Sequence, residues 1–262
     1  MVENLGDAES KFARAQTHLD VIREIVLDWQ NKTTHKTISE LDPDVSGLVH
    51  CQRYVARITG PPLPDLSDIL GDCIHNFRST LDHVIWRASV IHCDGTPPAP
   101  HRVGFPHWDV ADTYSAKGLH AVSDDVKAVV ERLQPYHAGQ DARSQPLWVV
   151  CELDNIDKHR AIHPVVHWAR TPDMKVESSI PGSWSEIMEP GPVEDGTVIA
   201  RLFSPVSMTR NEVTVRLSYQ HGVVIEETDT TPVLHLGNTL QNIGRAVHDA
   251  VRDIMRVVFP EM

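Results

Sequence analysis

The sequence predicts an α+β protein in which a bundle of long helices carries an N-terminal β-hairpin and an antiparallel β insertion. Apolar residues recur at steps of three and four over long stretches, a spacing typical of amphipathic helices. From Ile162 to Thr228 the chain changes to short β-branched runs separated by turn residues, which indicates antiparallel strands. We therefore expect three regions: a helical core with the hairpin at 1–160, the β insertion at 161–230, and a C-terminal helix at 231–262 that returns to the helical core.

The first helix is predicted at 7–29 and is followed by the hairpin. Its apolar stripe consists of Phe12, Ala15, Leu19, Ile22, Val26 and Trp29. Residues 33–59 then favour strand, turn and strand, because Asp42-Pro43-Asp44 and Gly47 supply turn residues between two strand-like runs.

The second long helix is predicted at 65–91. Proline precedes its first turn, and the early acidic residues Asp65 and Asp68 suit the positive end of a helix dipole. Its buried face is expected to comprise Leu70, Ile74, Phe77, Leu81, Val84, Ala88 and Ile91. The proline-rich run at 94–100 ends the helix.

The remaining elements follow in order along the chain. An ordered loop around Phe105-Pro106-His107-Trp108 precedes a short helix that Ser123 caps and that ends near Leu133. A further helix is predicted at 146–157 and the last one at 233–258, whose buried face runs through Leu236, Leu240, Ile243, Val247, Val251, Ile254 and Val258. Strands are expected at 162–168, 174–178, 197–203, 212–219 and 223–227, with His221-Gly222 as the turn between the last two.

The composition excludes several classes of protein. The chain has 262 residues, including 24 Lys and Arg, 36 Asp and Glu and 16 His, so its net charge is −12 with histidine neutral. No apolar stretch is long enough to span a membrane, and the acidic N-terminus lacks the apolar core of a secretory signal. The four cysteines are isolated, which favours reduced thiols and a cytoplasmic protein. The acidic balance argues against sequence-independent binding to nucleic acid phosphates.

The helix at 65–91 has an unusual polar face opposite its buried one. At 100° per residue, one stripe comprises Asp68, Asp72, His75, Ser79, Asp82 and Trp86, with Arg78 at its edge. Because a solvent-facing indole leaves a large apolar area in water, Trp86 argues against a purely solvated face. Three interpretations remain open: a solvated face, a packing surface such as a homodimer seam, or a chemical site.

A second polar segment, Asp154-Asn155-Ile156-Asp157-Lys158-His159-Arg160, closes the helix that begins at Pro146. Asp154 and Asp157 continue the apolar stripe of that helix, while its basic end also complements the helix dipole. If these carboxylates are buried, we expect Asp154 or Asp157 to meet His75 or Arg78.

The two polar segments carry a resemblance. The pattern Gly71-Asp72-x-x-His75-Asn76-x-Arg78-Ser79-x-Leu81-Asp82-His83, with the later Asp157-Lys158-His159-Arg160, resembles a bacterial protein family without an established activity. Phe105-Pro106 and Leu133-Gln134-Pro135-Tyr136 fit the same family pattern, and the resemblance covers about residues 7–165. It implies a shared fold.

More remotely, Arg78-Ser79-Thr80-Leu81-Asp82-His83 resembles the R-x(4–6)-H motif of HEPN domains, helical and often dimeric proteins that include metal-independent ribonucleases of toxin and defence systems. The resemblance implies a homodimer with RNA as substrate and no cofactor. Five positions are 140° apart on a helix, so the two side chains converge only through a kink or across a symmetric dimer. The same R-x4-H spacing occurs five times in the chain, but only this instance lies inside a long predicted helix.

On the ribonuclease interpretation, each residue of the two segments has an expected role. His83 acts as general acid or base and Arg78 stabilises charge on the phosphate, with Asp82 and His75 orienting them. The expected substrate-binding residues are Asn76, Lys158 and Arg160, and the expected supporting residues are Asp72, Asp154, Asp157 and His159.

Two alternatives belong to other classes. One is a non-enzymatic interaction or oligomerisation protein in which the polar residues form a structural network. The other is a metal-dependent hydrolase with ligands among His75, Asp82, His83, Asp157 and His159. Fingerprints of nucleophile-elbow hydrolases, P-loops and dinucleotide-binding folds are missing, so no dinucleotide cofactor is expected.

Overall fold

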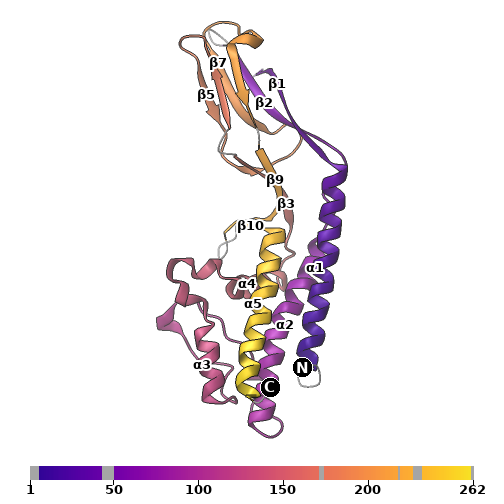
Figure 1. The fold of residues 1–262 in the computed structure, drawn as a ribbon, viewed down its shortest axis with the longest axis vertical. Helices are drawn as coiled ribbons and strands as arrows, with labels where there is room; N and C mark the ends of the chain where they lie inside the picture. Colours follow the sequence, from indigo (N-terminus) through magenta and orange to yellow (C-terminus); the bar gives the residue numbers. More distant parts are fainter. Residues whose placement is uncertain (1–5, 43–49, 171–173, 218, 227–231, 261–262) are drawn as a thin grey trace. The chain divides into compact units, whose positions relative to one another are not determined.

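The computed structural model describes residues 6–42, 50–170, 174–217, 219–226 and 232–260 (Figure 1). These residues form a mixed α+β structure with antiparallel sheets. The five α-helices in the described ranges are α1 (Asp7–Lys32), α2 (Ser67–His92), α3 (Asp124–Arg132), α4 (Pro146–Asp157) and α5 (Leu236–Val258). Short 3₁₀ segments occur at Pro100–Arg102, Ala111–Thr113, Pro135–Ser144 and Arg210–Glu212.

Ten strands lie within the same ranges. They are β1 (Thr34–Leu41), β2 (His50–Thr59), β3 (Pro164–Arg170), β4 (Lys175–Ser178), β5 (Trp184–Ile187), β6 (Gly191–Pro192), β7 (Val198–Ser204), β8 (Val213–Arg216), β9 (Tyr219–Ile225) and β10 (Leu234–His235). None of the described helices is long and apolar enough to cross a membrane.

The chain divides into two compact units. Unit 1 comprises residues 1–24, 65–164 and 225–262, and unit 2 comprises 25–64 and 165–224. The first boundary falls inside α1. The hairpin, which the sequence analysis placed with the helical core, belongs to unit 2, because β2 pairs with β7.

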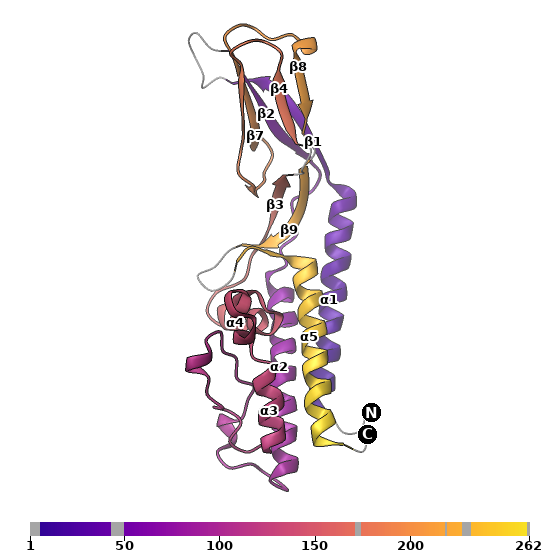
Figure 2. The same ribbon diagram turned by 60° about the vertical axis from the view of Figure 1, so that its left-hand side comes forward.

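Unit 1 is built on packed helices. Within it, α2 packs against both α4 and α5, and Figures 1 and 2 show α2 and α5 side by side. The rings of Phe12 on α1 and Phe77 on α2 meet edge to face, with centroids 5.8 Å apart. The apolar stripes predicted for these helices supply its core, which includes Leu19, Ile22, Leu70, Ile74, Phe77, Leu81, Leu240, Ile243 and Val247.

Unit 2 is built on antiparallel strands. Its first sheet has the order β1-β2-β7-β5, with a register shift between Tyr54 and Val55, and β9, β3 and β6 are neighbours in a second sheet. Strands β4 and β8 form a separate pair. Two apolar clusters form the core: Tyr54, Val176, Ala200 and Leu202 in one, and Ala56, Trp168, Val193 and Ile199 in the other.

The structure confirms one predicted helix cap and contradicts one predicted turn. The Ser123 cap is confirmed, since its side chain accepts a hydrogen bond from the N–H of Val126. The His221-Gly222 turn is wrong: both residues lie inside β9, because a short polar pair can continue a paired strand when a neighbour holds its backbone. Strands β5, β6 and β10 were not predicted, and the turn at residues 43–49 lies outside the described ranges.

Candidate functional site

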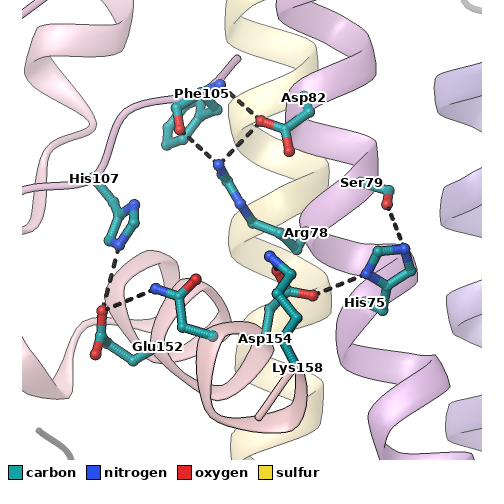
Figure 3. Close-up of polar contacts among 10 residues, drawn as sticks. His75, Arg78, Ser79, Asp82, Phe105, His107, Glu152, Asp154 and Lys158 are labelled. Atoms are coloured by element: carbon teal, nitrogen blue, oxygen red, sulfur yellow. Dashed lines mark hydrogen bonds and ion pairs between the residues drawn. The ribbon is translucent and has the colours of Figure 1, made fainter. Parts of the chain in front are cut away.

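The two polar segments singled out from the sequence meet in unit 1. The first lies on α2 and the second on α4 and the three residues that follow it, and a loop at residues 103–108 passes beside them (Figure 3). We call His75, Arg78, Asp82, Asp154 and Lys158 the polar cluster. The predicted long-range pairing is confirmed, because His75 contacts Asp154.

Arg78 joins α2 to the loop. Its Nη2 donates to the backbone oxygen of Phe105 at 2.9 Å and lies 3.0 Å from Asp82 Oδ1. The same carboxylate oxygen accepts the backbone N–H of Phe105 at 2.8 Å, so both peptide groups of this residue are held. The Arg78 side chain is only 15% exposed, so Nη2 is committed to these two groups, while Nη1 is buried without a hydrogen bond to a described residue.

Asp154 joins α4 to α2. Its side chain is 2% exposed, and each oxygen has a cationic or titratable partner: Oδ1 lies 2.9 Å from His75 Nδ1, and Oδ2 lies 2.6 Å from Lys158 Nζ. An ionised carboxylate only accepts hydrogen bonds, so Nδ1 of His75 carries the proton and donates. The other ring nitrogen, Nε2, then accepts from Ser79 Oγ at 3.3 Å.

Burial and neighbouring charges shift several pKa values here. Burial lowers the pKa of Arg78, but Cys151 and the carboxylates of Asp82 and Asp154 outweigh it and raise that pKa. Burial also raises the pKa of Cys151 to about 12, so its thiol stays neutral. Next to the cluster, burial and the Arg78 cation lower the pKa of His107.

Asp157 and Gly71 show why a small residue lies on this face of α2. A Cβ on Gly71 would lie 2.5 Å from Asp157 Oδ2, so only glycine lets this carboxylate lie against the helix. Burial, followed by the charges of Asp154 and Asp72, raises the pKa of Asp157. The environment of His75 is therefore crowded with carboxylates.

The other predicted site residues are not part of the polar cluster. Asn76 is buried and donates to the backbone oxygen of Asp72 at 2.7 Å, which is a contact within one helix turn. The side chains of His83, His159 and Arg160 make no hydrogen bond or ion pair with the part of the chain that the structure describes. His83 and Arg78 are thus not brought together within one chain.

Sequence reasoning missed the roles of three side chains and one backbone segment. His107 Nε2 lies 3.4 Å from Glu152 Oε1, linking the loop to α4. Gln134 donates to the backbone oxygen of Pro106 at 3.1 Å. The run Phe105-Pro106-His107-Trp108 indicated an ordered loop, but backbone acceptors carry no residue-type signal, so its role as a partner of Arg78 could not be read.

The chemical capacity of the cluster centres on His75, whose side chain is 53% exposed. Ser79, His75 and Asp154 are connected as hydroxyl, imidazole and carboxylate, the connectivity of a nucleophile, its base and an orienting group. Ser79 lies in the middle of α2, where backbone N–H groups bond within the helix, so they cannot form an oxyanion-binding site. The arrangement can hold a proton at His75 Nε2.

The proposed metal ligands are not gathered. In the described residues, no group of three or more His, Cys, Asp and Glu side chains is arranged to hold a metal ion. Comparisons with protein-family models, with curated proteins and with solved structures found no significant match for this chain.

Proposed function

We propose that this chain is a non-enzymatic interaction or oligomerisation protein in which the polar cluster is structural. The observation that carries the proposal is the state of Arg78, whose Nη2 is shared between Asp82 and the Phe105 backbone oxygen in a largely buried position. A guanidinium that must receive a phosphate needs free donors facing solvent. Here the guanidinium instead ties the loop to α2.

The second anchor of the cluster supports the same proposal. Both oxygens of Asp154 are occupied, one by His75 and one by Lys158, so α4 is tied to α2 without an open position for a ligand. We further propose that the helices of unit 1 form a HEPN-like bundle and that the protein is a homodimer. The side-by-side packing of α2 and α5 is consistent with such a bundle.

A metal-independent ribonuclease is the second candidate, and one observation favours it. His75 is half-exposed, and a buried carboxylate fixes its ring, which is an arrangement suited to a general acid or base. The surrounding carboxylates of Asp72, Asp154 and Asp157 disfavour a phosphodiester at this place, because like charges repel in a partly buried setting.

Incubation of purified protein with mixed RNA, with and without EDTA, tests the two candidates. The panel consists of the wild type, Arg78→Ala, and His75→Gln as a second variant that keeps a polar side chain. We expect RNA to remain intact in every sample. RNA cleavage by the wild type that either substitution abolishes overturns the structural proposal, and cleavage that EDTA abolishes indicates a metal hydrolase.

A further inference from the structure

Strand β1 forms one edge of the first sheet in unit 2. It pairs with β2 along its whole length, from Thr34 opposite Thr59 to Leu41 opposite Gln52, and β2 is its only neighbour in the sheet order of the described residues (Figures 1 and 2). An edge strand presents a row of unpaired N–H and C=O groups that can pair with another strand. At eight residues, β1 is long for an edge.

The edge lacks two common protections. Strand β1 contains no proline, and its pairing with β2 has no bulge. It also exposes apolar side chains, since Ile38 is 39% and Leu41 is 77% exposed. Lysine often discourages pairing at the edge of a sheet. A strand that pairs with β1 therefore needs a side chain opposite Lys36 that compensates its charge.

A second copy of β1 can pair with this edge only in the registers that the geometry of antiparallel strands allows. Two identical antiparallel strands in one sheet are related by a two-fold axis perpendicular to the sheet. Opposite residues must project to the same face, so the axis passes through a residue rather than between two residues. The registers that keep at least three residues of each β1 paired are therefore those centred on His35, Lys36, Thr37, Ile38, Ser39 or Glu40, and centring on His35 sets Lys36 opposite Thr34.

Charge selects among these registers. Centring on Lys36 or on Glu40 places two like charges opposite each other, which is unfavourable. Centring on Thr37 sets Lys36 opposite Ile38, and centring on Ser39 sets Ile38 opposite Glu40. Only the register centred on Ile38 places Lys36 of each copy opposite Glu40 of the other while the two Ile38 side chains meet.

The acidic member of that pairing is already held in position. Glu40 contacts Arg53 at 2.7 Å and Arg57 at 3.3 Å on the neighbouring strand, and its side chain remains 30% exposed. A restrained carboxylate loses less side-chain entropy on meeting Lys36 of a second copy.

From this edge geometry and charge pattern, we propose that two copies of the chain dimerise by antiparallel pairing of β1 with β1, centred on Ile38, with reciprocal Lys36–Glu40 ion pairs. The inference rests on the proposed function as an interaction protein and names its partner, a second copy. The paired sheets form one continuous sheet across the dimer.

Disulfide cross-linking of the full chain tests the register. In Ile38→Cys the two new thiols face each other, whereas in Leu41→Cys they lie about 20 Å apart along the strands. Leu41 is the more exposed residue, so random collision favours Leu41→Cys and the proposed register favours Ile38→Cys. We expect mild oxidation to give a covalent dimer in Ile38→Cys at several times the yield of Leu41→Cys. The wild type, with its native cysteines, sets the background.

Equal yields in the two variants, or no yield above background, overturn the proposal. Sedimentation of Lys36→Glu provides an independent measurement, because this substitution places like charges opposite Glu40 at two positions and is expected to weaken the dimer about tenfold. A wild type that stays monomeric at about 100 μM also overturns it. A monomeric wild type would also overturn the homodimer proposed above, whereas the proposed structural role of the polar cluster is tested separately, by RNA cleavage.

Discussion

The polar cluster of unit 1 and a stacked histidine pair in unit 2, His35 and His221, each contain a titratable group that is removed from solvent. The two regions accommodate that group in opposite ways. In the cluster, both oxygens of buried Asp154 have a partner, His75 on one and Lys158 on the other. In unit 2, the ring of His35 stacks on His221 with centroids 3.5 Å apart, and both nitrogens of His35 are buried without a hydrogen bond in the described residues.

The difference shows when burial shifts a protonation state and when it does not. Burial and the neighbouring His221 lower the pKa of His35 to about 4, so its ring is neutral in the folded protein. A buried charge with specific partners can persist, whereas a buried imidazole without an acceptor gives up its proton. Charged partners make the cluster sensitive to substitution, whereas the burial of both His35 nitrogens without a hydrogen bond to a described residue makes His35 sensitive to pH.

The largest effect is expected from removing both partners of Asp154. The double variant His75→Ala/Lys158→Ala leaves a 2% exposed carboxylate uncompensated, and we expect a loss of about 3–5 kcal/mol in the free energy of unfolding, measured by urea denaturation. Each single variant keeps one partner, so the double loss should exceed the sum of the single losses. Adding Asp154→Asn to the double variant should recover more than about 1 kcal/mol, because it removes the stranded charge. If the losses of the two single variants simply add up to that of the double variant, His75 and Lys158 do not jointly compensate Asp154.

The next effect concerns the other anchor of the cluster. Arg78→Ala strands the Phe105 backbone oxygen and Asp82 and leaves a gap where the alkyl stem lay, so we expect a loss of about 2–3 kcal/mol. Arg78→Lys is the matched control: it keeps the charge but not the planar fork, so its loss should be smaller. If Arg78→Ala lowers the free energy of unfolding by less than about 0.5 kcal/mol, the contacts of Arg78 with Phe105 and Asp82 do not stabilise the fold.

A smaller effect is expected from acidification, which acts on the histidine pair. The unfolded chain takes up a proton at His35 near pH 6.5, while the folded chain takes it up only near pH 4. Stability is therefore lost as the pH falls between these values, by about 1–2 kcal/mol once partial exposure is allowed for. Urea unfolding at about pH 7 and about pH 4.5 measures the loss. His35→Phe keeps a stacked ring that cannot titrate, so an undiminished pH dependence in this variant contradicts the assignment.

The helical elements and the contact between the two polar segments were predictable from the sequence. Helix α4 starts at Pro146 and ends at Asp157 as expected, because proline at a first turn and an apolar stripe are local signals. The His75–Asp154 contact followed from acidic residues that extend an apolar face. An acidic residue that extends an apolar helix face indicates a buried carboxylate, and a buried carboxylate requires a partner.

Other features depended on tertiary pairing, which leaves little local trace. Trp86 remains 37% exposed within the chain, although its position suggested a partner. The two-residue strand β6 and the continuation of β9 through His221-Gly222 are imposed by neighbouring strands rather than by β-branched runs. The role of Phe105 depends on its peptide group, which every residue possesses.

The smallest predicted effect runs in the stabilising direction and concerns Asp157, which lies beside the cluster without an ion pair or hydrogen bond to a described residue. Burial and the charges of Asp154 and Asp72 raise its pKa, so its ionised form opposes folding at neutral pH. Asp157→Asn keeps the shape against Gly71 and removes the charge, and we expect a gain of about 0.5 kcal/mol in urea unfolding at about pH 7. The gain should shrink as the pH falls below the raised pKa and vanish below the ordinary aspartate pKa of 3.8, where Asp157 is neutral in both the folded and the unfolded chain. Asp124→Asn, at an exposed carboxylate paired with Lys127, is the control and should not stabilise. A loss of stability in Asp157→Asn would show that this carboxylate, like Asp154, has a compensating partner.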